Sequence, residues 1–152
     1  FLKKLEITGT KVIYGQNELK IIGPSSLNSI NISTEPHPGF PTDLQAQFMS
    51  LMCFAEGKSL IRENIFENRF QHVPELRKMG ANILVKKNKA YVTGLKSLQG
   101  AKVKATDLRA SMSLIIAALA ADGESNILEL EHLKRGYENI EDKLSNLGAQ
   151  IN

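Results

Sequence analysis

The sequence predicts an α/β (α+β) protein built from a repeated unit of strand, helix, strand, helix and hairpin. Short β-prone runs alternate with longer segments whose apolar residues recur at helical spacing. The order also repeats, because Thr-Asp-Leu stands at 42–44 and at 106–108, and Gly-Ala at 80–81 and at 148–149. A strand–helix–strand connection gives parallel, right-handed pairing and a hairpin gives antiparallel pairing. We therefore expect a mixed sheet in each unit.

The first third of the chain should hold a hairpin, a short strand and the start of a long helix. Residues 11–14 and 19–22 are β-prone and flank a turn, and 29–33 alternates polar with apolar residues. The proline-rich segment 37–41 predicts a rigid approach to the helix. Helical spacing then runs from about Asp43 to Glu56, and Gly57 is a natural stop.

The remaining elements follow the same order along the chain. They are a strand at 59–63, a helix with Pro74 in its first turn that ends at Gly80, a hairpin of 83–85 and 90–92, a strand at 102–104, a helix at 107–122, a strand at 126–128 and a last helix from Tyr137 to Leu147. We interpret 1–152 as a single partial lobe, with 1–36 the end of one unit, 37–104 a second unit and 105–152 an incomplete third. The strand and long helix absent from the first unit should leave an apolar face near Leu2, Leu5 and the flanks of the long helices, which favours self-association.

Composition narrows the class of function. At 152 residues and 42% hydrophobic, the chain is large enough for one domain with a core. The net charge of +3 comes from interspersed residues, which suits an anionic small molecule better than nucleic acid. A single cysteine, Cys53, excludes an intrachain disulfide and favours a reducing, cytoplasmic location. We expect no membrane partner, because no apolar run reaches about 18 residues. The first residue is Phe1, so we expect a piece of a larger protein.

Asp43 and Asp107 are each predicted at the junction between the end of an extended segment and the start of a helix. A carboxylate there meets free backbone N–H groups and the positive end of the helix dipole. The simplest interpretation of both residues is therefore an ordinary N-cap.

Five stretches, taken together and in order, resemble the UDP-N-acetylglucosamine 1-carboxyvinyltransferase family of enolpyruvyl transferases. They are Phe-Pro-Thr-Asp-Leu-Gln-Ala-Gln at 40–47, Phe-Glu-Asn-Arg-Phe at 66–70, His-Val-Pro-Glu-Leu at 72–76, Ala-Thr-Asp-Leu-Arg-Ala-Ser at 105–111 and Arg-Gly-Tyr-Glu at 135–138. The resemblance implies most of a C-terminal half, forming an incomplete pseudo-threefold, inside-out α/β barrel lobe. It also implies transfer of enolpyruvate from phosphoenolpyruvate to the 3-hydroxyl of UDP-N-acetylglucosamine, the first committed step of peptidoglycan synthesis, with no metal or organic cofactor.

The resemblance also implies roles for individual residues. Asp43 matches the family's proposed general base, and Arg135 matches an arginine that reaches the phosphoenolpyruvate carboxylate or the leaving phosphate. Arg109 falls in the active-site arginine set, while Ile65, through its backbone, and Phe66 match the lining of the uridine-sugar pocket. The chemistry needs a base at the hydroxyl, an acid at the methylene carbon and cations for the carboxylate and phosphate.

Other reactive residues have simpler interpretations. We interpret Arg69 as structural, paired with Glu67 or with an acid elsewhere, and Arg135 as the start of a helix. Cys53 should be a buried structural thiol, since it falls mid-helix beside Met52 and Phe54. The resemblance implies that the family's reactive cysteine and its phosphoenolpyruvate-binding lysine match nothing here, so the chain alone should be inactive. His72 and His132 lack the spacing of metal ligands.

Three alternatives remain open from the sequence. The chain could be a non-catalytic binding or structural module on the same scaffold, or a mildly basic domain for nucleic acid. It could also belong to an enolpyruvylshikimate-phosphate synthase-like enzyme, although those enzymes in general lack the Phe-Glu-Asn-Arg and Arg-Gly-Tyr-Glu stretches.

Overall fold

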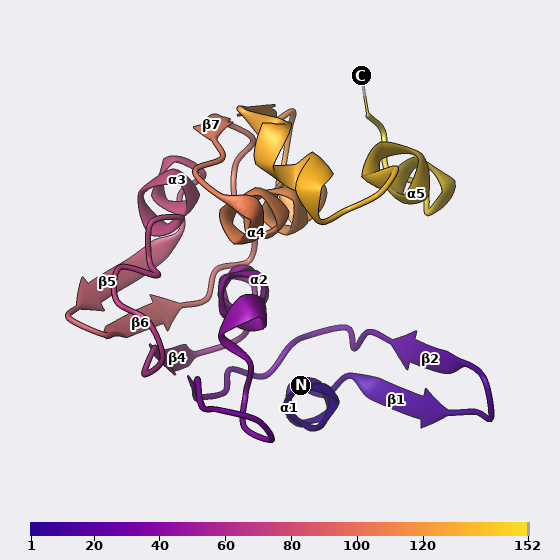
Figure 1. Ribbon diagram of the computed structural model, residues 1–152, viewed down its shortest axis with the longest axis vertical. Helices are drawn as coiled ribbons and strands as arrows, with labels where there is room; N and C mark the ends of the chain where they lie inside the picture. Colours follow the sequence, from indigo (N-terminus) through magenta and orange to yellow (C-terminus); the bar gives the residue numbers. More distant parts are fainter. Residues whose placement is uncertain (152) are drawn as a thin grey trace.

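Two helices side by side form the centre of the molecule. The computed structural model describes residues 1–151, and in it α2 (Gln45–Met52) packs against α4 (Leu108–Ala120) (Figure 1). The buried Ser50 hydroxyl donates to the carbonyl of Ser113 at 2.8 Å, which ties the two helices together. All residues of α2 except Leu51 are buried, so this helix is enclosed nearly all round by other elements.

A four-stranded sheet has the order β3 (Ile32–Ser33), β4 (Lys58–Arg62), β6 (Lys89–Thr93) and β5 (Asn82–Lys86). The last three strands belong to the second predicted unit, and β3 comes from the end of the first. β3 and β4 run parallel, whereas β4, β6 and β5 pair antiparallel. The predicted mixed sheet is therefore confirmed. The helix α3 (Val73–Lys78) begins with Pro74 in its first turn, as predicted, and buries Val73 and Leu76.

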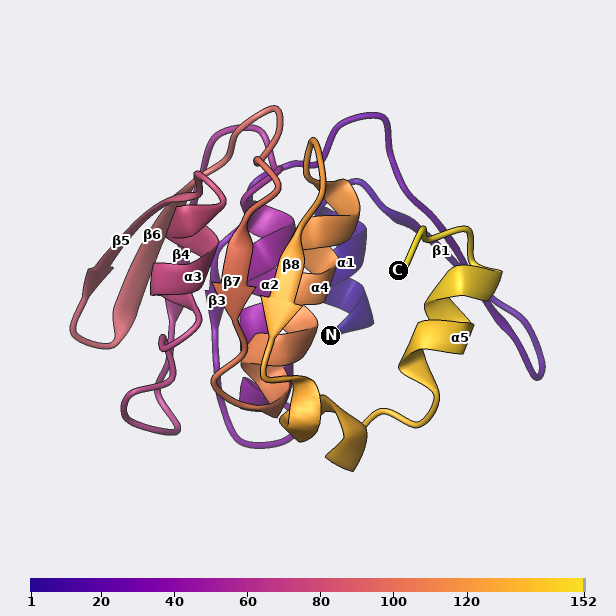
Figure 2. The same cartoon turned by 90° about the horizontal axis from the view of Figure 1, so that it is seen from above.

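The next strand–helix–strand segment repeats this arrangement. β7 (Lys102–Lys104) and β8 (Asn126–Leu128) pair parallel, and α4 connects them (Figure 2). The 3₁₀ helix η2 (Leu130–Arg135) and the helix α5 (Ile140–Asn146) follow. The α/β fold class is thus confirmed, while the unit boundaries at 36/37 and 104/105 stay a prediction.

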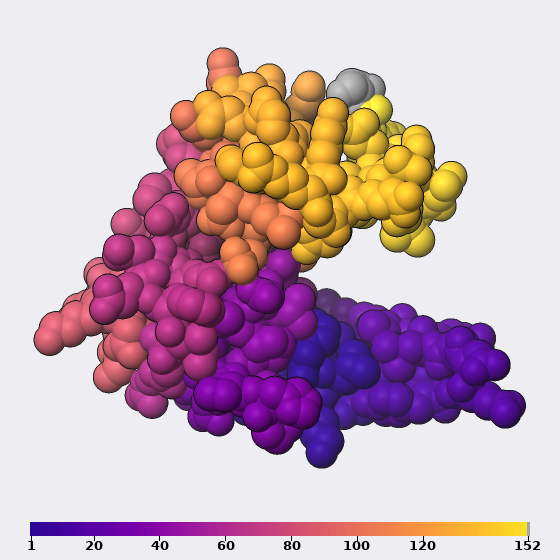
Figure 3. All heavy atoms as spheres, viewed as in Figure 1, coloured from indigo at the N-terminus to yellow at the C-terminus, as the bar shows by residue number. Residues whose placement is uncertain are grey.

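The first hairpin stands away from the rest of the molecule. α1 (Leu2–Ile7) leads into β1 (Lys11–Tyr14) and β2 (Leu19–Ile22), which pair only with each other in the described chain (Figure 1). Figure 3 shows an open notch between this hairpin and the C-terminal segment. Leu2 and Leu5 are half-buried, while their neighbours Phe1 and Ile7 are 44% and 56% exposed and Leu119 of α4 is 53% exposed. Apolar surface is therefore open near the predicted positions, and self-association through it stays a prediction. The exposed apolar residues of the hairpin are Ile13, Tyr14, Leu19, Ile21 and Ile22.

Three predicted elements differ clearly from the structure in their bounds. The first long helix begins with a 3₁₀ turn, η1 (Thr42–Leu44), and α2 ends at Met52, short of the predicted Glu56. The chain then turns before Gly57, whose φ of +100° lies in the region that favours glycine. The strand predicted at 29–33 is reduced to its last two residues, and α5 begins at Ile140.

None of the helices in residues 1–151 combines the length and the apolar character that a membrane span requires.

Candidate functional site

The Asp43 carboxylate faces an arginine from the next unit and caps no helix. Neither η1 nor α2 has a side-chain cap, so the N-cap prediction for Asp43 is wrong. Arg109 Nε donates to Asp43 Oδ1 at 2.6 Å, and Arg69 Nη1 lies 3.8 Å from the same oxygen. The Asp43 side chain is 69% exposed, so a ligand can reach it.

Asp107 does cap its helix, as predicted. Its Oδ1 accepts from the amides of Arg109 at 2.8 Å and Ala110 at 3.2 Å, which satisfies two free N–H groups at the start of α4. The same cap fixes the backbone of Arg109, whose side chain then reaches back to Asp43. The Thr-Asp-Leu segments at 42–44 and 106–108, called the two elbows below, therefore differ in what their aspartates bind: Asp43 binds an arginine and Asp107 caps a helix.

Arg69 joins the Asp43 carboxylate to the Phe66 ring. Its Cζ lies 4.3 Å from the ring centroid, a cation–π distance, and its side chain is only 20% exposed. The acid that pairs with Arg69 is thus Asp43, and the structure places this arginine among the candidate site residues. Sequence reasoning missed that placement, although Arg69 stands 66 residues before Arg135, at the same repeat position.

Ile65 and Phe66 lie in the loop that follows β4. Their amides donate to Glu63 Oε1 at 2.9 and 3.2 Å. A ligand that binds Ile65 through its backbone would therefore use the carbonyl oxygen. Phe66 is 52% exposed on the rim of a hollow of about 860 Å³, lined by 63–71 together with Val85, Lys87 and Asn88.

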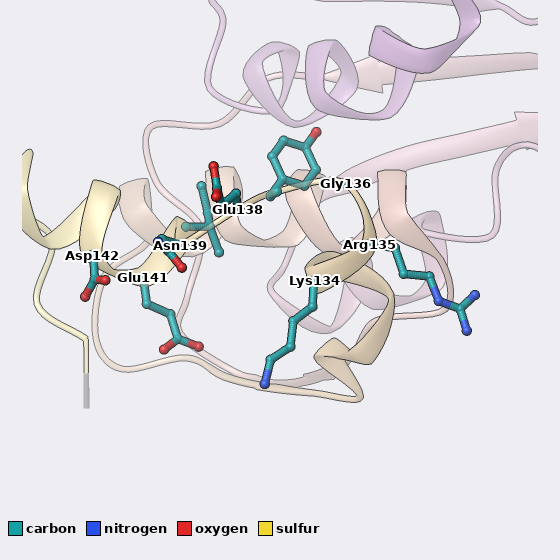
Figure 4. A pocket seen from close by; sticks show the side chains of 9 residues that line it. Lys134, Arg135, Gly136, Glu138, Asn139, Glu141 and Asp142 are labelled. Carbon is teal, nitrogen blue, oxygen red and sulfur yellow. The ribbon is translucent and has the colours of Figure 1, made fainter.

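Arg135 makes no ion pair with the Asp43 carboxylate in the described chain. It is the last residue of η2, so the prediction that it starts a helix is wrong. The residue is exposed, and within residues 1–151 its guanidinium makes no ion pair. It borders a hollow of about 630 Å³ lined by 134–142, and its guanidinium lies far from the carboxylates of Glu141 and Asp142 (Figure 4). The Tyr137 hydroxyl accepts from Gln47 Nε2 at 3.5 Å, which ties this segment to α2.

Two other reactive groups, Cys53 and His72, are buried. Burial raises the pKa of the Cys53 thiol to about 12, so the predicted structural thiol is confirmed as a buried group. Burial lowers the pKa of His72 to about 4, against a smaller opposing effect of Asp107. Across residues 1–151, no three His, Cys, Asp or Glu side chains gather in a metal-binding cluster.

The repeated strand–helix–strand units and the arginine–carboxylate cluster define a lobe of the carboxyvinyl transferase class. The family model of EPSP synthase (3-phosphoshikimate 1-carboxyvinyltransferase) matches residues 1–144, and the chain belongs to that family. Within it, the chain is 56% identical over 148 residues to UDP-N-acetylglucosamine 1-carboxyvinyltransferase of Geotalea daltonii, which covers 97% of this chain and 36% of the relative. The enzyme of the same name from Rickettsia bellii is 55% identical over 148 residues, with 97% and 35% covered. The chain thus spans about a third of the length of these relatives.

Solved structures agree with this placement. The enolpyruvyl transferase NikO from Streptomyces tendae superposes with a TM-score of 0.91 at 32% identity, over 99% of this chain and 35% of NikO. EPSP synthase from Acinetobacter baumannii superposes with a TM-score of 0.70 at 15% identity, over 99% of this chain and 36% of the synthase. The second likeness concerns the fold alone.

Proposed function

We propose that this chain supplies part of the active site of a UDP-N-acetylglucosamine 1-carboxyvinyltransferase. The reaction transfers enolpyruvate from phosphoenolpyruvate to the 3-hydroxyl of UDP-N-acetylglucosamine and releases phosphate, which commits the sugar nucleotide to bacterial peptidoglycan. The observation that carries the proposal is the exposed Asp43 carboxylate held by Arg109 and Arg69 beside Phe66. The 56% identity to enzymes of that name supports it.

Asp43 acts as the general base in this proposal. Both arginines contact its Oδ1, and among the described residues Oδ2 has no hydrogen-bond partner and is left to accept the proton of the attacking hydroxyl. General base catalysis contributes typically 10²- to 10⁴-fold to a rate. Arg109 and Arg135 bind the carboxylate or phosphate of phosphoenolpyruvate, since a planar guanidinium offers paired donors to either group.

Ile65 and Phe66 bind the nucleotide sugar at the rim of the hollow beside them. The acid that protonates the methylene carbon comes from outside this chain, because Cys53 is buried and burial raises its pKa to about 12. The reaction needs no metal or organic cofactor and takes place in the cytoplasm. The isolated chain is inactive and binds neither nucleic acid nor membranes.

The test is phosphate release by the full-length protein that carries this sequence, with both substrates present. Asp43→Asn should lower kcat by about 10²- to 10⁴-fold. The matched control is Asp107→Asn at the second elbow, which keeps a capping oxygen and should retain the parent's rate. An unchanged rate for Asp43→Asn would reduce this residue to a structural element and overturn the proposal.

The family model's own description favours a second candidate acceptor, 3-phosphoshikimate. The full-length protein is assayed for phosphate release with phosphoenolpyruvate and each of the two acceptors in turn. Turnover with 3-phosphoshikimate and none with the nucleotide sugar would replace the proposed substrate.

We further propose that the isolated chain self-associates through a second copy of the exposed β1–β2 hairpin. Its outward apolar residues include Tyr14, 61% exposed, and Ile21, 50% exposed. Sedimentation of the chain over a range of concentrations should show a dimer that Ile21→Lys removes. A monomer at every concentration would refute this.

A further inference from the structure

Glu63 is a buried carboxylate without a cationic partner in the described chain. It is 3% exposed and follows the last residue of β4. Burying a carboxylate is costly unless hydrogen bonds replace its water. Four donors do so here: the hydroxyls of Thr34 at 2.8 Å and Thr42 at 2.9 Å, and the amides of Ile65 at 2.9 Å and Phe66 at 3.2 Å.

The two oxygens of Glu63 hold different parts of the candidate site. Oε1 accepts from Thr34, Ile65 and Phe66, and so fixes the loop proposed to bind the nucleotide sugar. Oε2 accepts from Thr42, the residue directly before Asp43. One side chain therefore sets the position of the proposed base relative to the proposed sugar-binding loop.

The repeat shows that the fold does not require this arrangement. Glu129 stands 66 residues later at the same repeat position, yet it is exposed and pairs with Lys104 at 2.7 Å. Thr106, the counterpart of Thr42, is also exposed. In the described chain, the buried carboxylate with four donors therefore stands beside Asp43 and Phe66, and its repeat counterpart beside Asp107 lacks this arrangement.

Resting on the proposed function, we propose that Glu63 is a positioning residue for the transfer reaction. It acts through Thr42 on Asp43 and through the amides of residues 65 and 66 on the bound nucleotide sugar. Misplacement of a reacting group by about 1 Å can cost on the order of 10²-fold in rate. Loss of the bond to Thr42 should therefore be visible in kcat.

Thr42→Val tests this link with least disturbance, since it deletes one hydroxyl and leaves the other three bonds of Glu63 in place. In the full-length protein it should lower kcat about tenfold or more and change KM for UDP-N-acetylglucosamine by less than about threefold. Glu63→Ala releases both parts and should lower kcat and raise that KM. Glu63→Gln should recover most of the rate, because its carbonyl oxygen can replace Oε1 and its amide can donate to the Thr42 hydroxyl. The matched controls Thr106→Val and Glu129→Gln should retain the parent's kinetics.

The kinetics of these variants separate the inference about Glu63 from the proposed function. A selective loss of kcat in Thr42→Val supports the inference, also where Glu63→Ala fails to fold. Parental kinetics in Thr42→Val, in an enzyme that Asp43→Asn disables, would overturn it and leave the proposed function standing. A full-length protein without any transfer activity would overturn the proposed function first, and this inference with it.

Discussion

The two Thr-Asp elbows should differ in what they contribute to stability. Asp107 accepts from two amides of α4 at 2.8 and 3.2 Å, so Asp107→Ala removes a working N-cap. Such a loss costs about 1 kcal/mol. Asp43 caps nothing, its side chain is 69% exposed, and its pair with Arg109 is screened by water, so Asp43→Ala should cost less than about 0.5 kcal/mol.

Urea unfolding of the 152-residue chain, followed by far-UV circular dichroism, measures the change in unfolding free energy for both variants, provided that they share the parent's m-value. Asp107→Ala should also lower Tm by about 2–4 °C, the shift expected for about 1 kcal/mol in a domain of this size. Asp107→Ser keeps a capping oxygen and should stay within a few tenths of a kcal/mol of the parent. Equal costs at the two elbows, or a Ser variant as unstable as the Ala variant, would refute this reasoning.

Three further predictions concern Cys53, His72 and Gly94. The Cys53 thiol, with its pKa raised to about 12, should resist iodoacetamide at pH 8 in the folded chain and react once urea unfolds it. For His72, the unfolded pKa near 6.5 exceeds the folded pKa of about 4, so the unfolded state binds the extra proton. Stability should therefore fall by up to about 3 kcal/mol between pH 6.5 and 4, and His72→Gln should flatten that slope in urea titrations. Gly94→Ala would drive its Cβ into the Ala55 carbonyl and should cost more than about 2 kcal/mol by thermal unfolding, whereas Gly23→Ala meets no atom within 4 Å and should cost almost nothing.

The elements that sequence reasoning placed well have a local physical cause. The hairpin of β5 and β6 follows from two β-prone runs around a turn, and α3 begins where Pro74 can only stand in a first turn. Asp107 caps α4 because the helix itself supplies the donors. In each case the interacting residues lie close together in the sequence, so the local sequence pattern is enough to predict the element.

Asp43 differs because its partner lies 66 residues away in the chain. The local pattern around both elbows is the same Thr-Asp-Leu, and only the first has an arginine within 2.6 Å of its carboxylate. That contact depends on how α4 packs against α2, which no local pattern specifies. The hydrogen bonds to Glu63 could not be predicted from the sequence for the same reason, since the Thr34 and Thr42 hydroxyls reach its carboxylate only after β3 pairs with β4.

Arg135 shows a different limit of the sequence. The Arg-Gly-Tyr pattern indicated a helix start, but η2 ends there and α5 begins only at Ile140. Gly136 leaves room for the side chain of Leu108, so packing against the first turn of α4 shapes this segment more than its helical propensity does.

One repeat position accounts for the asymmetry between the elbows. Gln45 and Arg109 both stand two residues after an elbow aspartate, and Gln45 is buried within α2 whereas Arg109 reaches out to the unit before its own. The Arg109 guanidinium binds the Asp43 carboxylate at 2.6 Å as a charged donor, and such a bond is stronger than one from a neutral amide. Asp43 gives up the cap's contribution to stability and becomes an exposed carboxylate between two guanidinium groups. The contact between two repeated units at this junction thus depends on the identity of one side chain in the later unit.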